Sequence, residues 1–149
     1  MIIKHIGRVS GALLAAAFMS TVLVAPASAA PQGDHDDPPD RVGDGVCNVY
    51  GSHGELCLYY FSNRNGSLLD LYDSDEDLEN DEFLSPGPGH GQSVTNNVES
   101  VWNRDRRHSW RLCTEPDGDG DCMVVRPNRV INRLPSNFRN NVESAYLLD

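Results

Sequence analysis

The chain has 149 residues, a formal net charge of −10 at pH 7 and a sequence pI of about 4.7. A protein with this much negative charge is repelled by nucleic acids and by anionic membrane surfaces, so both classes of partner are excluded. The length suffices for a single domain, which we expect to be a monomer.

Residues 1–29 have the pattern of a secretory signal peptide. Lys4 and Arg8 precede an apolar run at residues 9–24, and Ala27-Ser28-Ala29 has the small residues that signal peptidase requires. A membrane anchor is the alternative, but the apolar run is shorter than the roughly 20 residues that span a bilayer. We therefore expect a secreted, extracellular protein.

Residues 30–45 are rich in Asp, Pro and Gly and contain almost nothing apolar. Such a segment buries too little surface to offset its loss of conformational entropy, so we expect a disordered acidic tail. Residues 46–149 remain as the predicted folded domain.

Short apolar and aromatic runs alternate in this domain with clusters of Gly, Asn, Asp and Pro, and no segment has a sustained helical period. This pattern predicts an all-β domain, and the number of short strands favours a Greek-key sandwich over a barrel. The expected strands are 56–62, 68–72, 98–102, 109–114, 123–126, 130–134 and 142–147.

One pentapeptide, Asn-Asn-Val-Glu-Ser, occurs twice, at Asn96–Ser100 and Asn140–Ser144. Upstream of each copy, a strand-like run enters a polar turn closed by glycine and continues into a second strand-like run. The repetition predicts two related motifs, at about 46–104 and about 105–149.

The first motif is the longer of the two between its turn glycine and its pentapeptide. We place the extra residues in the acidic stretch between Tyr72 and Gly91. The part of this stretch from Asp70 to Glu82 is interpreted as a solvated loop.

The four cysteines form two local pairs in the predicted domain. Four cysteines allow three pairings, and the duplication favours one disulfide in each motif, Cys47–Cys57 and Cys113–Cys122. A zinc site is the alternative, but neither pair has the Cys-x2-Cys spacing of structural zinc.

The chain contains no His-Glu-x-x-His or Gly-x-Ser-x-Gly motif, so we do not expect an enzyme. The histidines of the domain, His53, His90 and His108, adjoin turn or polar residues, for which solvated surface is the default. Acidic stretches at Asp73 and Asp117 begin like EF-hand loops, but they lack the glycine at position six and the glutamate at position twelve.

Tyr59, followed by Gly66 and then by Asn96–Ser100, resembles the Greek-key motif of the βγ-crystallin family. In that family the serine hydroxyl folds back on a hairpin whose glycine adopts a positive φ. The second motif matches through Gly120 and its own pentapeptide, but Cys113 stands where an aromatic residue is usual. The resemblance implies a sandwich of two Greek-key motifs.

Calcium-binding members of this family take oxygen ligands from the Asn pair and the serine. The resemblance thus implies calcium as an optional cofactor, although no cofactor is required. Those motifs usually end in a second serine, whereas this chain has Val101 and Ala145, so a purely structural role competes with calcium binding. The implied ligands are Asn97, Ser100, Asn141 and Ser144.

A second resemblance covers most of the domain. Cys57–Gly66 reads Cys-Leu-Tyr-Tyr-Phe-Ser-Asn-Arg-Asn-Gly, and Gly87–Asn97 reads Gly-Pro-Gly-His-Gly-Gln-Ser-Val-Thr-Asn-Asn. Both are similar to the secreted actinobacterial metalloproteinase-inhibitor family, peptidase inhibitor family thirty-six. The resemblance implies an inhibitor of an extracellular, thermolysin-like metalloprotease.

Inhibitors of this kind present a rigid loop that the protease binds like a substrate. Thermolysin-like enzymes favour a bulky apolar residue after the attacked bond, so we expect the contact loop beside the second disulfide. The alternatives are that Met123 and Val124 are core strand residues, and that the chain is a non-inhibitory calcium-binding or structural domain. The expected contact residues are Cys113, Thr114, Cys122, Met123 and Val124.

Overall fold

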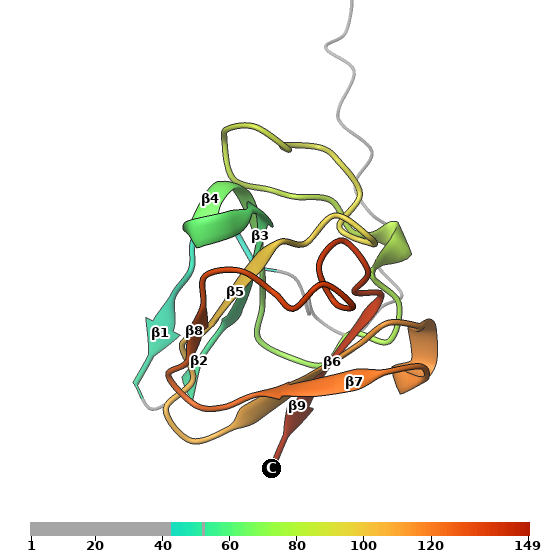
Figure 1. Ribbon diagram of the computed structural model, residues 1–149. Helices are drawn as coiled ribbons and strands as arrows, with labels where there is room; N and C mark the ends of the chain where they lie inside the picture. Colours follow the sequence, from blue (N-terminus) through green and yellow to red (C-terminus); the bar gives the residue numbers. More distant parts are fainter. Residues whose placement is uncertain (1–42, 52) are drawn as a thin grey trace, which may run out of the picture. The chain divides into compact units, whose positions relative to one another are not determined.

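The computed structural model describes residues 43–51 and 53–149, in which all helices are single 3-10 turns (Figure 1). The strands are β1 Val49–Tyr50, β2 His53–Gly54, β3 Leu56–Phe61, β4 Asn65–Leu71, β5 Ser100–Asn103, β6 Ser109–Cys113, β7 Cys122–Val125, β8 Val130–Ile131 and β9 Ser144–Leu148. The 3-10 turns are η1 Ser62–Arg64, η2 Leu78–Asn80 and η3 Pro116–Gly118. The all-β prediction is confirmed, and each predicted strand has a counterpart. Strands β1 and β2 were missed, because neither lies in an apolar run of strand length.

The predicted signal peptide, residues 1–29, and most of the predicted tail, residues 30–45, lie outside the described residues. Within the described part, no helix has the length and apolar character needed to cross a lipid bilayer.

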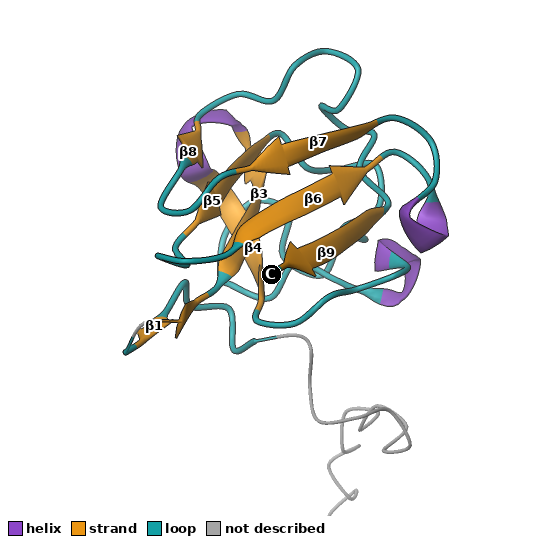
Figure 2. Ribbon diagram, turned by 90° about the horizontal axis from the view of Figure 1, so that it is seen from below, coloured by secondary structure: helices purple, strands orange, loops and turns teal. Residues whose placement is uncertain are grey.

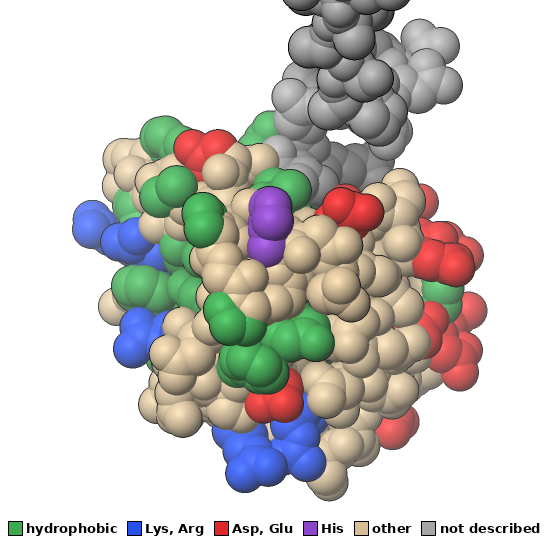
Figure 3. Space-filling model, turned by 90° about the horizontal axis from the view of Figure 1, so that it is seen from above, with side chains coloured by type: hydrophobic (Ala, Val, Ile, Leu, Met, Phe, Trp, Pro, Cys, Tyr) green, Lys and Arg blue, Asp and Glu red, His purple; other side chains and the backbone are tan. Residues whose placement is uncertain are grey.

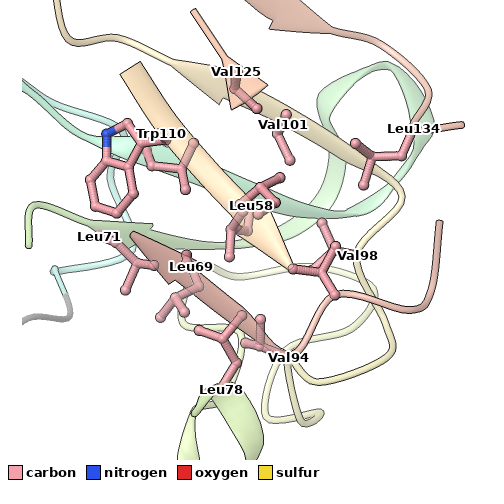
Figure 4. Packing of buried hydrophobic residues seen from close by; sticks show 14 of the residues in the cluster. Leu58, Leu69, Leu71, Leu78, Val94, Val98, Val101, Trp110, Val125 and Leu134 are labelled. Carbon is pink, nitrogen blue, oxygen red and sulfur yellow. The ribbon is translucent and has the colours of Figure 1, made fainter. Parts of the chain in front are cut away.

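Two antiparallel sheets form the two layers of the domain (Figure 2). One sheet has the strand order β4-β3-β5-β8 and the other has the order β7-β6-β9, while β1 and β2 pair separately. Alternate residues point between the layers, so Leu69 and Leu71 of β4 and Trp110 and Leu112 of β6 are fully buried (Figure 4). Burying a large apolar side chain stabilises the fold by roughly 1.5–3 kcal/mol. The predicted sandwich is confirmed.

Each motif supplies a segment that completes the sheet of the other. Strand β8 of the second motif pairs with β5 of the first, with Ile131 opposite Val101. Reciprocally, Asp75 of the first motif forms a bridge with Ala145 on β9 of the second. The two motifs are therefore related and interlocked.

The pentapeptides meet at the centre of this arrangement. The N–H of Asn96 donates to the carbonyl of Val142 at 3.1 Å, and the N–H of Asn140 donates to the carbonyl of Val98 at 2.8 Å. In each bond, the first residue of one pentapeptide donates to the third residue of the other pentapeptide. This reciprocity is what an approximate twofold relation between the motifs requires.

The extra residues of the first motif lie between η2 and the pentapeptide, in the loop at the top of Figure 1. A bridge between Glu82 and Ser93 closes this loop, and Phe83 and Val94 bury their side chains in the core. The solvated-loop interpretation of Asp70–Glu82 holds only in part, because Asp70, Asp75 and Leu78 are buried.

On the face shown in Figure 3, basic side chains gather along the left and lower edges, and acidic side chains are most frequent along the right edge, with a few others between and above the basic ones. The separation has a source in the sequence, since the acidic stretch at 70–82 contains no arginine and most arginines follow residue 103. This face therefore has an acid-rich edge and arginine-rich edges, although the net charge of the chain is strongly negative.

Candidate functional site

The serine of each pentapeptide closes the hairpin of its own motif. The hydroxyl of Ser100 donates to the carbonyl of Phe61 at 2.6 Å and accepts the N–H of Arg64 at 3.0 Å. The hydroxyl of Ser144 donates to the carbonyl of Glu115 at 2.7 Å and accepts the N–H of Gly118 at 3.3 Å. Both serines are fully buried, so these bonds satisfy hydroxyl groups that are cut off from water. We call each pair of bonds a serine clasp.

Glycine makes both clasped hairpins possible. Gly66 and Gly120 have φ of 76° and 73°, the left-handed region that other residues adopt at a cost. A Cβ atom at Gly120 would lie 2.5 Å from Oγ1 of Thr114, too close for any side chain. The glycine spacing in the sequence therefore marked the hairpin turns correctly.

The predicted calcium ligands lie in the two pentapeptides and also have structural roles. Ser100 and Ser144 form the serine clasps. The side-chain amide of Asn97 donates to the carbonyl of Ser93, and that of Asn141 donates to the carbonyl of Asn137, both at 3.0 Å. Each asparagine thus caps the turn before its strand, and calcium binding stays a prediction.

The loop between β6 and β7 is held in shape at several points. Its ends are joined by the Cys113–Cys122 disulfide. Inside that bridge, the N–H of Thr114 donates to the carbonyl of Asp121, and the N–H of Asp121 donates to Oγ1 of Thr114, each at 3.0 Å. The N–H of Asp117 donates to the carbonyl of Glu76 at 2.8 Å. We call residues 113–124 the clamped hairpin.

The predicted contact residues differ in their exposure within the clamped hairpin. Val124 points outward with 53% of its surface exposed, and Cys122 is exposed as well. Thr114 is half-buried, Met123 packs against the core, and Cys113 is fully buried. The side chains that a partner could reach are therefore those of Val124, Cys122 and Thr114.

Both predicted disulfides are present, Cys47–Cys57 and Cys113–Cys122, and no cysteine of the described residues is free. They are not equivalent, however. Cys113–Cys122 joins the two strands of a hairpin, at the position where the first motif pairs Tyr59 with Leu68. Cys47–Cys57 instead ties the segment before β1 to the second residue of β3.

A cluster of polar side chains that the sequence pattern did not indicate lies on the side of the domain with β1 and β2. His53 on β2 meets Asp105 and His108 from the turn between β5 and β6, and one potential ligand atom of each residue lies within 4.8 Å of the others. His53 is exposed, as expected for the histidines, but His108 is half-buried. Only the i,i+3 spacing of Asp105 and His108 was visible in the sequence.

A cavity of about 630 Å³ adjoins this cluster. His53 and Asp105 line it together with Tyr50, Tyr72 and Glu55. Burial raises the pKa of Glu55 to about 7, although the N–H of Asn48 donates to its carboxylate and opposes the shift.

The carboxylate of Asp105 behaves in the opposite way. Burial alone would raise its pKa, but the backbone N–H groups of His108, Arg107 and Gly54 donate to it and lower the pKa to about 2. These hydrogen bonds therefore favour the ionised form of Asp105.

The sequence profile of Peptidase inhibitor family I36 matches residues 50–125. No curated protein sequence matches the chain. The structure is similar to one solved in work on the evolution of the eye lens βγ-crystallin domain fold, with a TM-score of 0.58, 16% identity, and coverage of 71% of this chain and 95% of the other. It is also similar to a βγ-crystallin domain from Clostridium beijerinckii, with a TM-score of 0.50, 9% identity, and coverage of 63% and 96%. At these identities the likeness establishes the fold alone.

Proposed function

The chain belongs to Peptidase inhibitor family I36, and we propose that it is secreted and inhibits an extracellular metalloendopeptidase of the thermolysin-like class. Membership in this family indicates a protein that acts by binding a peptidase and performs no catalysis of its own. The disulfides are compatible with an extracellular location, because exported proteins keep such bonds whereas cytosolic thiols are held reduced.

The observation that carries the proposal is the rigidity of the clamped hairpin. A disulfide and the paired bonds between Thr114 and Asp121 hold its ends together, and the Ser144 clasp holds its middle. A loop that is ordered before binding does not lose that conformational entropy when it meets the protease. The clamped hairpin is therefore suited to bind in the protease's substrate site. Its ends would stay joined by the disulfide and the hydrogen bonds during binding.

Two features suggest how the protease would engage this loop. Val124 supplies an exposed apolar side chain of the kind that thermolysin-like enzymes accept after the attacked bond, and Thr114 lies beside the other end of the disulfide. Strand β7 is also the edge of its sheet in the described structure, so its backbone can pair with an extended segment of the protease. Met123 supports this strand from the core side.

The proposal is tested by titrating a thermolysin-like protease with the purified protein and measuring residual peptidase activity. We expect activity to fall as the protein approaches the protease concentration. Unchanged activity at micromolar protein would overturn the proposal and leave the alternative, a non-inhibitory structural or calcium-binding βγ-crystallin domain.

The contact surface is tested by Val124→Asp. A charge in an apolar subsite should weaken inhibition by about tenfold or more, since burying a valine side chain is worth roughly 1.5–3 kcal/mol. Val46→Asp is the matched control, because Val46 is exposed to a similar extent, 54% against 53%, and lies outside the hairpin. Equal inhibition by the two variants would exclude Val124 from the contact.

A further inference from the structure

We propose that His53, Asp105 and His108 bind a divalent transition-metal ion of the Zn²⁺ class, with one coordination position open toward the adjacent cavity. The three residues each offer one ligand atom, and these atoms lie within 4.8 Å of one another. This site shares no residue with the clamped hairpin: His108 directly precedes β6, whereas the Cys113–Cys122 disulfide lies at the other end of that strand.

Asp105 is already held in position as a ligand. Its carboxylate accepts the backbone N–H groups of Gly54 at 3.2 Å, Arg107 at 2.6 Å and His108 at 2.8 Å. The side chain is 3% exposed, so it has little freedom to turn away. A metal ion would meet a fixed, ionised carboxylate, and no ordering of this residue would be required on binding.

His108 lies at the distance from Asp105 that two ligands of one metal ion have. Its buried Nδ1 atom lies 3.3 Å from Oδ1 of Asp105 and has no partner besides this carboxylate in the described structure. Two ligand atoms on one tetrahedral zinc ion, with bonds of about 2.0–2.1 Å, are about 3.3–3.4 Å apart. This spacing is therefore the one that a shared metal ion requires.

His53 is brought to the same place by the close approach of β2 to the turn between β5 and β6. A Cβ atom at Gly54 would lie 2.3 Å from the carbonyl oxygen of Arg104, so only glycine allows this approach. The rings of His53 and His108 are consequently parallel, with centroids 5.6 Å apart and an interplanar angle of 6°. Because an imidazole nitrogen binds a metal in the plane of its ring, the exposed His53 side chain has to rotate out of this parallel stack to share an ion with His108.

The ligand set selects the class of metal. Two imidazole nitrogens and one carboxylate suit Zn²⁺ and Co²⁺, whereas Ca²⁺ takes six to eight oxygen ligands. Three protein ligands leave the fourth tetrahedral position to water or to a small ligand. The cavity lined by His53 and Asp105 offers the space for it.

The test is a calorimetric titration of Zn²⁺ into the protein prepared without a polyhistidine tag, with Co²⁺ absorption as a second readout of tetrahedral coordination. We expect one ion per chain. His53→Ala removes an exposed ligand without disturbing the core, and it should weaken Zn²⁺ binding by more than about tenfold. His90→Ala is the control, since His90 is exposed on the loop between η2 and β5.

Three outcomes would overturn the proposal. The first is the absence of binding heat and of a Co²⁺ spectrum. The second is binding that survives His53→Ala, and the third is an equal loss in the His90→Ala control. Retained binding in His90→Ala together with loss in His53→Ala supports the site.

Discussion

The hydroxyl groups of Ser100 and Ser144 each stabilise the hairpin of their own motif. Each hydroxyl is buried and bonds both to a carbonyl and to an N–H of the hairpin in its own motif. Those backbone groups have few other partners within reach, because the 3-10 turns η1 and η3 are only one turn long. The repeated pentapeptide is thus explained at the residue scale by a hydrogen-bonding requirement that occurs twice.

Ser100→Ala and Ser144→Ala should each lower the free energy of unfolding by about 1–3 kcal/mol, because each leaves a hairpin carbonyl and N–H unsatisfied. Urea unfolding of the two variants measures this loss. The exposed Ser136→Ala serves as the control and should change stability by less than about 0.5 kcal/mol. A clasp variant as stable as the control would show that water replaces the hydroxyl.

The two hairpins differ at the scale of the element, although they descend from the same pattern. Tyr59 and Leu68 face each other in the first hairpin, and the Cys113–Cys122 disulfide occupies the same position in the second. Where the first hairpin has the packed side chain of Tyr59, the second hairpin therefore has a covalent bond between its strands. It makes the second hairpin rigid while leaving Val124 exposed.

Removing either disulfide should lower stability by a similar amount, on the order of 2–3 kcal/mol, since the bridged residues are separated by 9 and 10 positions. Only the variant Cys113→Ala/Cys122→Ala should also lose affinity for the protease, because it alone loosens the clamped hairpin. The variant Cys47→Ala/Cys57→Ala is the matched control. Urea unfolding and the inhibition constant of each variant are the two measurements. An equal loss of inhibition in both would attribute the effect to overall stability.

The whole molecule depends on the exchange of segments between the motifs. Strand β8 completes the sheet of the first motif, and Asp75 bridges to β9 of the second. The hydrophobic core is also shared, since Leu58 and Val101 from one motif pack in the same cluster as Trp110 and Val125 from the other. Neither motif has a complete sheet or a complete core of its own.

Residues 43–104 and 105–149, produced separately, should therefore each remain unfolded. The expected sign is poor dispersion of amide resonances in NMR spectra of either fragment, with the intact domain as the reference. A well-dispersed spectrum from one fragment alone would contradict the shared-core account.

The sequence predicted much of the fold but only part of the site. Turn glycines such as Gly66, the short apolar runs between turn residues and the local cysteine pairs are signals contained in short windows, and each was interpreted correctly. The exposure of Val124 and the core packing of Met123 were left as alternatives, because adjacent strand residues look alike until the sheet is assembled. The meeting of His53 with His108 left no local signal.

By itself, the sequence determined the all-β class, the duplication and the pairing of the cysteines, because each depends on interactions between residues close along the chain. Only the tertiary structure decided which segments the motifs exchange, which face of the clamped hairpin is exposed, and that His53 lies beside Asp105. These features arise from contacts between segments far apart in the sequence, where packing of the two sheets, and not local backbone preference, determines which side chains meet.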